Sequence, residues 1–263
     1  MTAGRSRPEE QRLPGGNLHG AVRIGDTVRK RSGPWTPAVD ALLRHLEDVG
    51  FRGAPRSLGV DEQGRHVTAY LPGETVGDQV PWPDWVWRED TPAQAARWLR
   101  RYHDAVATFS PPEDAVWRLS SDVDRGLPVC HNDVAPYNVV WDDGIVGVID
   151  WDLAAPSDPR WDVAQACVGF SPLLPNDLAL RDGADPTAAF ERCRRLLDAY
   201  GVEDRVVYAR LVRERYEISL RRIRHEATTD DAFARLLADN EPFFGSVLAH
   251  LDSIEDELAA ALA

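Results

Sequence analysis

The sequence predicts an α+β protein of two lobes, in which a small antiparallel β-sheet with one helix precedes a larger, mainly helical part. Short β candidates cluster between residues 21 and 70. After residue 91, apolar residues recur at helical spacing, interrupted by one hairpin pattern over residues 139–149. We therefore expect an N-terminal lobe over residues 1–71 and a C-terminal lobe over residues 72–263.

The N-terminal part contains four short β candidates and one strong helix pattern. Thr36 is the predicted N-cap of the helix, Pro37 suits its first position and Gly50 ends it. Its apolar residues recur three and four apart, which predicts one buried face: Val39, Leu42, Leu43, Leu46 and Val49. The predicted strands cover residues 21–24, 27–30, 57–60 and 66–70.

The C-terminal part is predicted to be helical around the single hairpin. Asp142-Asp143-Gly144 is typical of a tight turn between the short β runs at residues 139–141 and 145–149. Thr91-Pro92 opens one helix and Asp185-Pro186 opens another, which ends before Gly201. The apolar stripes of these helices indicate core packing rather than a cofactor site.

Three polar residues around the hairpin suggest a chemistry. Asp133 and Asn138 lie five positions apart, and Asp150 follows the second β run. A hairpin would bring Asn138 and Asp150 together at its open end. Two carboxylates and an amide supply the hard oxygen ligands that divalent cations prefer and a group that orients a hydroxyl, which is the requirement of phosphoryl transfer.

Lys30 is an independent observation, because it is the only lysine in a chain rich in arginine. In an extended strand, Lys30 shares a face with Val28, whereas Arg29 and Arg31 lie on the opposite face. Lys30 would then point inward, where a compact ammonium suits contact with phosphate. A solvated lysine within a cationic run is the equally weighted alternative.

Together these residues resemble the aminoglycoside phosphotransferase and choline kinase branch of the protein-kinase-like small-molecule kinases. The resemblance rests on His131-Asn132-Asp133 with Asn138 and on Ile149-Asp150-Trp151-Asp152, which are similar to the catalytic-loop and metal motifs of that family. It extends to residues 157–162, 99–103 and 69–74, and covers the chain from about residue 15 to about residue 170. It implies the two-lobed protein-kinase-like fold.

The resemblance also implies roles for particular residues. Asp133 becomes the catalytic base or hydroxyl-orienting group, and His131 belongs to the catalytic loop as a brace. Asn138 and Asp150 become the Mg²⁺ ligands. The groups implied to contact ATP or GTP are Lys30 at the phosphates, the glycine pair Gly15 and Gly16 in a phosphate-covering turn, and the backbone of Tyr70 and Leu71 near the adenine ring.

This sequence departs from the family pattern at two places. Position 132 is Asn where these kinases usually have Gly. The helix that should carry a glutamate for the strand lysine has Val39 at the expected position. Asp40 or Glu47 are the possible substitutes, and absence of this ion pair is the third alternative.

The general properties of the chain restrict its partners. A formal charge of −13 argues against nucleic acid, which requires a basic face. Three widely spaced cysteines indicate buried thiols rather than a disulfide framework or zinc site. No apolar run has membrane-spanning length and no signal peptide begins the sequence, so we expect a cytoplasmic protein, a monomer or weak homodimer.

The sequence says least about the acceptor, the molecule that would receive the phosphoryl group. Acidity favours an aminoglycoside-like or otherwise cationic hydroxyl compound, with four acids as candidate contacts: Asp152, Asp158, Asp230 and Asp231. A wholly solvated acidic surface is the alternative reading. A non-catalytic nucleotide-binding module and a kinase of a choline-like or sugar metabolite remain alternative functions, whereas no P-loop motif occurs. The tryptophans at positions 82, 85 and 87 either pack their loop onto the larger lobe or line a ligand pocket.

Overall fold

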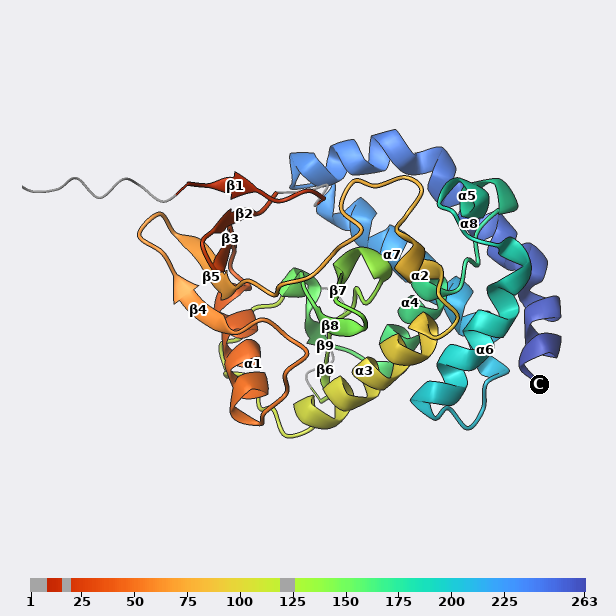
Figure 1. The fold of residues 1–263 in the computed structure, drawn as a ribbon, viewed down its shortest axis with the longest axis horizontal. Helices are drawn as coiled ribbons and strands as arrows, with labels where there is room; N and C mark the ends of the chain where they lie inside the picture. The colour runs from red at the N-terminus through yellow and green to blue at the C-terminus, as the bar shows by residue number, and fades with distance from the viewer. Residues whose placement is uncertain (1–8, 16–19, 119–125) are drawn as a thin grey trace, which may run out of the picture.

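A computed structural model describes residues 9–15, 20–118 and 126–263. A five-stranded antiparallel sheet forms the smaller part, at the left of Figure 1, with strand order β1-β2-β3-β5-β4. Its strands are β1 (Gln11–Arg12), β2 (Val22–Ile24), β3 (Thr27–Arg31), β4 (Ser57–Val60) and β5 (Arg65–Ala69). Strand β1 was not predicted, because two polar residues carry no strand pattern by themselves.

One helix, α1 (Thr36–Asp48), packs beside this sheet. Four residues of the predicted apolar face are buried, namely Val39, Leu42, Leu43 and Leu46. The prediction was wrong for Val49, which follows the last turn and is 46% exposed. Gly50 follows the helix with a φ of 79°, the left-handed conformation that glycine adopts most easily. Thr36 is the first residue of the helix and not its N-cap as predicted, because Trp35 holds the N-cap position. The Thr36 hydroxyl accepts a hydrogen bond from the Gly33 amide at 2.9 Å.

The larger part is mainly helical and lies at the right of Figure 1. Its helices are α2 (Asp84–Trp87), α3 (Thr91–Val106), α4 (Pro159–Phe170), α5 (Asn176–Arg181), α6 (Ala189–Tyr200), α7 (Val207–Glu226) and α8 (Asp231–Leu262). Two small antiparallel pairs lie between the sheet and these helices: β7 (Val139–Trp141) with β8 (Ile145–Val148), and β6 (Val129–Cys130) with β9 (Ala155–Pro156).

The core extends through both parts, and it confirms the predicted apolar stripes. Trp98, Leu99 and Tyr102 of α3 are fully buried, as are Cys193 and Leu197 of α6. All three cysteines are free and buried, as predicted. The α+β class and the arrangement of a small sheet with one helix beside a larger helical part are therefore confirmed.

The predicted division after residue 71 falls in the segment that follows β5. Gly73 in this segment has a φ of 145°, and its Cα lies so close to the Trp141 carbonyl that a Cβ would come within 2.7 Å of the oxygen. The domain bounds 1–71 and 72–263 themselves stay a prediction. In the described part of the chain, no helix is both long enough and apolar enough to cross a membrane.

The tryptophan loop packs onto the larger part through stacked rings. Trp82 stacks on Trp87 and Trp85 on Trp141, with interplanar angles of 8° and 9°. The Trp87 indole donates to the Asp182 carbonyl at 2.9 Å. These contacts favour the packing alternative over a ligand pocket.

Candidate active site

The predicted catalytic loop lies between β6 and β7. Asn132 has a φ of 64°, a left-handed conformation that asparagine tolerates better than most residues. The loop then closes in a 3-10 helix, Pro136–Asn138, with the Asn138 amide bonded to the Ala135 carbonyl at 2.9 Å. This turn returns Asn138 to the side chain of Asp133.

Both carboxylate oxygens of Asp133 accept hydrogen bonds within the loop. Tyr137 donates its hydroxyl to Oδ1 at 2.9 Å, and Asn138 donates Nδ2 to Oδ2 at 2.8 Å. The same Nδ2 also donates to the Asp133 carbonyl at 2.9 Å. Because Nδ2 of Asn138 donates these hydrogen bonds, the side-chain oxygen Oδ1 is the atom of Asn138 that can bind a cation.

The hairpin brings Asn138 and Asp150 to its open end, as predicted. Val139 pairs with Val148, and the Ile149 amide donates to the Asn138 carbonyl at 2.8 Å. Asp150 follows with a φ of 64°, at the start of the 3-10 helix Trp151–Leu153. The left-handed turn gives Asp150 an orientation that continued strand geometry would not.

Lys30 of β3 reaches this hairpin across the molecule. Its Nζ lies 2.6 Å from Asp150 Oδ1 and 3.1 Å from Asp152 Oδ2. The lysine therefore points toward the predicted metal ligand rather than into solvent, with a side chain that is 25% exposed. Asp152, a predicted acceptor contact, is the second partner of this ammonium.

Charge sharing sets the protonation of this cluster. Burial alone would lower the pKa of Lys30, but the Asp150 and Asp152 carboxylates outweigh it and raise that pKa. Burial likewise opposes ionisation of Asp150, whereas Lys30 holds the pKa of this carboxyl below its ordinary value. Burial, assisted by the charge of Asp150, raises the pKa of Asp133 to about 7. A carboxyl with such a pKa is well matched to accept a proton near neutrality.

Neither acid proposed on α1 substitutes for the missing glutamate. Asp40 accepts a hydrogen bond from the Ser57 hydroxyl and pairs with Arg44 at 2.9 Å. Glu47 lies 3.7 Å from Arg56. Val39 is buried in the core. Among the described residues, the third alternative therefore holds: α1 sends no carboxylate to Lys30, whose partners are Asp150 and Asp152.

Asp162 braces the catalytic loop from α4, a function that we did not predict for it. Its Oδ1 accepts the Asn132 amide at 2.6 Å, and its Oδ2 accepts the His131 amide at 2.8 Å and His103 Nε2 at 3.3 Å. Burial opposes the anion, but the His103 hydrogen bond and the backbone amides keep the pKa of Asp162 below its ordinary value. The only indication in the sequence is its place at the end of the Ser157–Asp162 motif.

The His131 ring contacts the segment that leads into Asp150. Its Nε2 donates to the Ile149 carbonyl at 3.2 Å, and its ring packs edge-on against Trp151 with centroids 4.5 Å apart. Burial lowers the pKa of this imidazole. His131 thus connects the catalytic loop to the strand that leads into Asp150.

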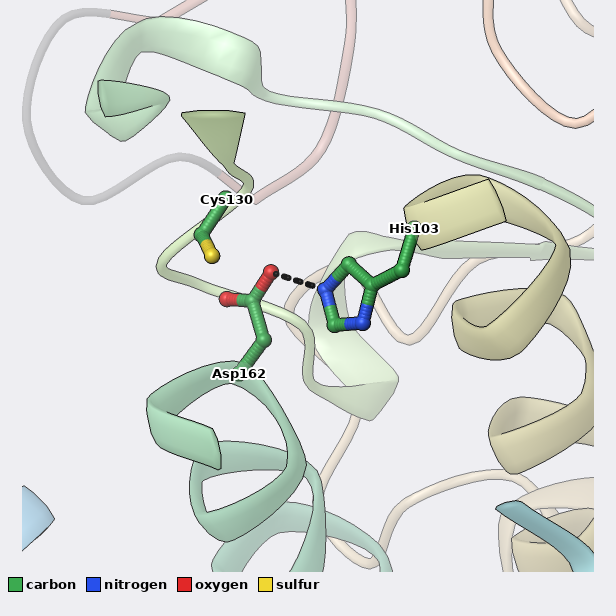
Figure 2. Close-up of side chains that lie close together, drawn as sticks. All are labelled: His103, Cys130 and Asp162. Carbon is green, nitrogen blue, oxygen red and sulfur yellow. Dashed lines mark hydrogen bonds and ion pairs between the residues drawn. The ribbon is translucent and has the colours of Figure 1, made fainter. Parts of the chain in front are cut away.

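His103, Cys130 and Asp162 converge from α3, β6 and α4 (Figure 2), with potential ligand atoms within 4.8 Å of one another. The chemistry of the three groups does not favour a metal. Burial raises the pKa of the Cys130 thiol well above its ordinary value, and the thiol donates to the Ser157 carbonyl at 3.2 Å. Both Asp162 oxygens already accept hydrogen bonds. The cluster is part of the loop brace.

The remaining predicted site residues have other contacts. The Gly15 amide donates to Asp78 Oδ1 at 3.1 Å, whereas Gly16 lies outside the described residues. The Tyr70 amide donates to the Asp26 carbonyl at 2.9 Å, and the guanidinium carbon of Arg23 lies 3.7 Å from the centre of the Tyr70 ring. Leu71 and Tyr70 line a cavity of about 250 Å³ between α1 and the segment after β5. Their contacts with nucleotide stay predictions.

Two of the acids predicted to contact the acceptor cap helices. Asp158 caps α4 by accepting the Arg160 amide at 2.9 Å, and it also pairs with the Arg160 side chain. Asp230 caps α8 and lies 3.7 Å from Arg118. Asp231 is exposed in the first turn of α8. Contact of these acids with an acceptor stays a prediction.

The fold is that of the protein-kinase-like phosphotransferases. A profile of the phosphotransferase enzyme family, APH, matches residues 81–196. The trifolitoxin immunity protein of Rhizobium leguminosarum bv. trifolii is 39% identical over 197 residues, which cover 72% of this chain and 73% of that protein. The chain belongs to this phosphotransferase family.

Solved structures agree on the fold. The amicoumacin kinase hAmiN, in complex with AMP-PNP, Ca²⁺ and Ami, has a TM-score of 0.60 and 12% identity, with 94% of this chain and 88% of that chain covered. The GDP complex of aminoglycoside 2'-phosphotransferase-IIIa has a TM-score of 0.56 and 16% identity, with 97% of this chain and 94% of that chain covered. Choline kinase from Cryptosporidium parvum Iowa II has a TM-score of 0.57 and 11% identity, with 99% of this chain and 94% of that chain covered.

Proposed function

We propose that this chain transfers the γ-phosphoryl group of ATP or GTP to a hydroxyl of a small antibiotic or toxin. The observation that supports this most is the convergence of Asp133, Asn138 and Asp150 at one end of the β7–β8 hairpin, with Lys30 opposite. The match to a phosphotransferase family and the 39% identity to an immunity protein together support a protective role against such a compound. An enzyme that consumes these nucleotides would work in the cytoplasm.

The donor set fits magnesium. Asn138 offers an amide oxygen and Asp150 offers a carboxylate, the hard ligands that Mg²⁺ prefers. When bound, the metal would neutralise charge on the nucleotide phosphates. Lys30 would move from Asp150 to a phosphate oxygen as a point charge.

Asp133 would receive the acceptor hydroxyl. Asn138 fixes Oδ2 of Asp133, so the acceptor oxygen would approach Oδ1, where the Tyr137 hydroxyl now donates. The carboxylate would orient the hydroxyl for in-line attack on the γ-phosphorus and take its proton. This catalysis consists of positioning and electrostatic stabilisation.

The class of acceptor has weaker support. The formal charge of −13 favours a cationic compound, as aminoglycosides are. Asp158 and Asp230 support this less than the sequence suggests, because both cap helices and pair with arginines. We therefore put a toxin or antibiotic with a reactive hydroxyl first and a choline-like or sugar metabolite second.

The test is nucleotide consumption with Mg²⁺ over a panel of aminoglycosides, macrolides, nucleoside antibiotics, choline-like alcohols and trifolitoxin, with mass spectrometry of the product. Asp133→Asn should lower turnover by about 10²- to 10⁴-fold and leave nucleotide affinity nearly unchanged. Asp150→Ala should instead weaken binding of magnesium-nucleotide. Asp143→Asn is the matched control, because Asp143 lies in the same hairpin with a side chain that is 95% exposed.

Unchanged turnover in Asp133→Asn would remove this residue from the catalytic role. Normal magnesium-nucleotide affinity in Asp150→Ala would remove the metal assignment. Magnesium-dependent nucleotide binding without transfer to any member of the panel would instead support the non-catalytic alternative.

A further inference from the structure

Arg215 of α7 is a buried cation that points at the catalytic loop. Arg215 is 2% exposed. Nη2 donates to the Asn132 carbonyl at 2.5 Å, and Nη1 donates to the Ser219 hydroxyl. Among the described residues, Nε has no hydrogen-bond partner and no carboxylate forms an ion pair with this guanidinium.

A buried guanidinium without an ion pair is unfavourable unless its position serves another purpose. Burial lowers the pKa of Arg215, and the charges of Asp162 and Asp133 counter this effect. Both carboxylates belong to the loop or to its brace. The charge of Arg215 is therefore balanced by the catalytic loop itself, at longer range than an ion pair.

Asn132 receives contacts from three directions. Its amide donates to Asp162, and its Nδ2 donates to the Cys130 and Ala155 carbonyls at 3.2 Å each. From α7, Arg215 binds its carbonyl and Arg222 Nη1 lies 3.4 Å from its Oδ1. A glycine would lack the side-chain contacts, so the departure from the family pattern at position 132 is part of a connection between α7 and the loop.

We infer that Arg215 is a positioning residue, which acts through the Asn132 carbonyl to fix the left-handed turn that orients Asp133. Asn132 and Asp133 share a peptide group, so rotation of this group would turn the Asp133 side chain away from its bonds with Tyr137 and Asn138. Helix α7 thereby controls the geometry of the catalytic carboxylate. The consequence for turnover rests on the proposed function, whereas the effect on loop order does not.

Arg192 of α6 offers a matched control. It is also a buried arginine, 7% exposed, and it donates to the carbonyls of Phe170, Val86, Trp87 and Arg88 at 2.8 to 3.0 Å. None of these acceptors belongs to the catalytic loop. Arg192→Lys and Arg215→Lys therefore remove similar contacts at two places of the larger part.

The experiment compares the two variants in the full chain. Arg215→Lys should raise amide hydrogen exchange at His131 and Asn132 about fivefold or more relative to wild type, whereas Arg192→Lys should leave both amides unchanged. With an acceptor from the panel, Arg215→Lys should lower kcat by about 10- to 100-fold at unchanged nucleotide KM. If Arg215→Lys does not fold, Arg215→Gln is measured in the same way, with the same expectation.

Equal exchange at the two loop amides in wild type and the Arg215 variant would overturn the inference. So would an equal rise in the Arg192 variant, because it would mean a general loosening of the fold. A wild-type chain that phosphorylates nothing would defeat the proposed function alone, since amide exchange requires no acceptor.

Discussion

The ion pair between Lys30 and Asp150 predicts effects of opposite sign on metal and nucleotide binding. Asp150 is the proposed Mg²⁺ ligand, and Lys30 Nζ lies 2.6 Å from its Oδ1. Lys30 and a metal ion therefore compete for the same carboxylate. Lys30→Met should strengthen binding of Mg²⁺ or Mn²⁺ alone and weaken binding of the nucleotide, because it removes the competitor and the phosphate contact together.

The distances and exposures set the magnitude. Two unit charges 4 Å apart interact by about 4 kcal/mol at an effective dielectric constant of 20. The side chains of Lys30 and Asp150 are 25% and 42% exposed, so solvent screening reduces this to about 1–2 kcal/mol. We expect the dissociation constant of the metal alone to fall about 5- to 30-fold.

Isothermal titration with Mn²⁺, first without and then with nucleotide, measures both effects. Arg29→Met is the control, since Arg29 lies next to Lys30 on β3 and instead approaches Asp61 at 3.7 Å. Metal affinity that is unchanged or weaker in Lys30→Met would refute the competition. Nucleotide affinity equal to that of wild type would refute the phosphate contact.

Three further predictions concern stability. Burial lowers the pKa of His66 in the folded chain, so the stability that its neutral form contributes is present above the unfolded pKa of about 6.5 and is lost as pH falls, by at most about 1.4 kcal/mol per pH unit. His66→Gln should therefore reduce the pH dependence of the free energy of unfolding, measured in urea between pH 7 and 5. The same pH dependence in the variant and the wild type would contradict this. Gly73→Ala should lower the free energy of unfolding in urea by about 2 kcal/mol or more, because the new Cβ would lie 2.7 Å from the Trp141 carbonyl oxygen. Gly25→Ala is the control and should lose about 1 kcal/mol, because nothing lies within 4 Å of its Cβ position. Equal losses in the two variants would exclude the steric cause. Asp162→Asn should lose about 3–5 kcal/mol, since it turns an amide toward backbone donors, and a loss below about 1 kcal/mol would exclude the brace.

Local sequence predicted the elements that local physics determines. The hairpin and its turn follow from short β runs around Asp-Asp-Gly, and its register brings Asn138 and Asp150 together. Strand alternation likewise offered an inward Lys30 as one of two equally weighted readings, and the structure agrees with this one. In these cases residues close in sequence determine where a side chain points.

Contacts between distant segments were not predictable in the same way. The partner of Lys30 lies 120 positions away, and Arg215 lies 83 positions from the carbonyl that it binds. The sequence offered Asp158 and Asp230 as contacts to the acceptor, and the fold uses both as helix caps. Spacing along the chain does not reveal which arginine a folded helix brings near an acid.

In the proposed function, each reactive group of the substrate-free site is held by another group that a substrate must replace. Lys30 holds Asp150 where a metal would bind, and Tyr137 holds Asp133 Oδ1 where an acceptor hydroxyl would bind. The backbone beneath them is fixed by Asp162 and by the bond from Ile149 to Asn138. Substrate binding at this site therefore requires exchange of side-chain partners rather than rebuilding of the loop, and the Asp133 and Asp150 carboxylates remain neutralised or hydrogen-bonded until each substrate arrives.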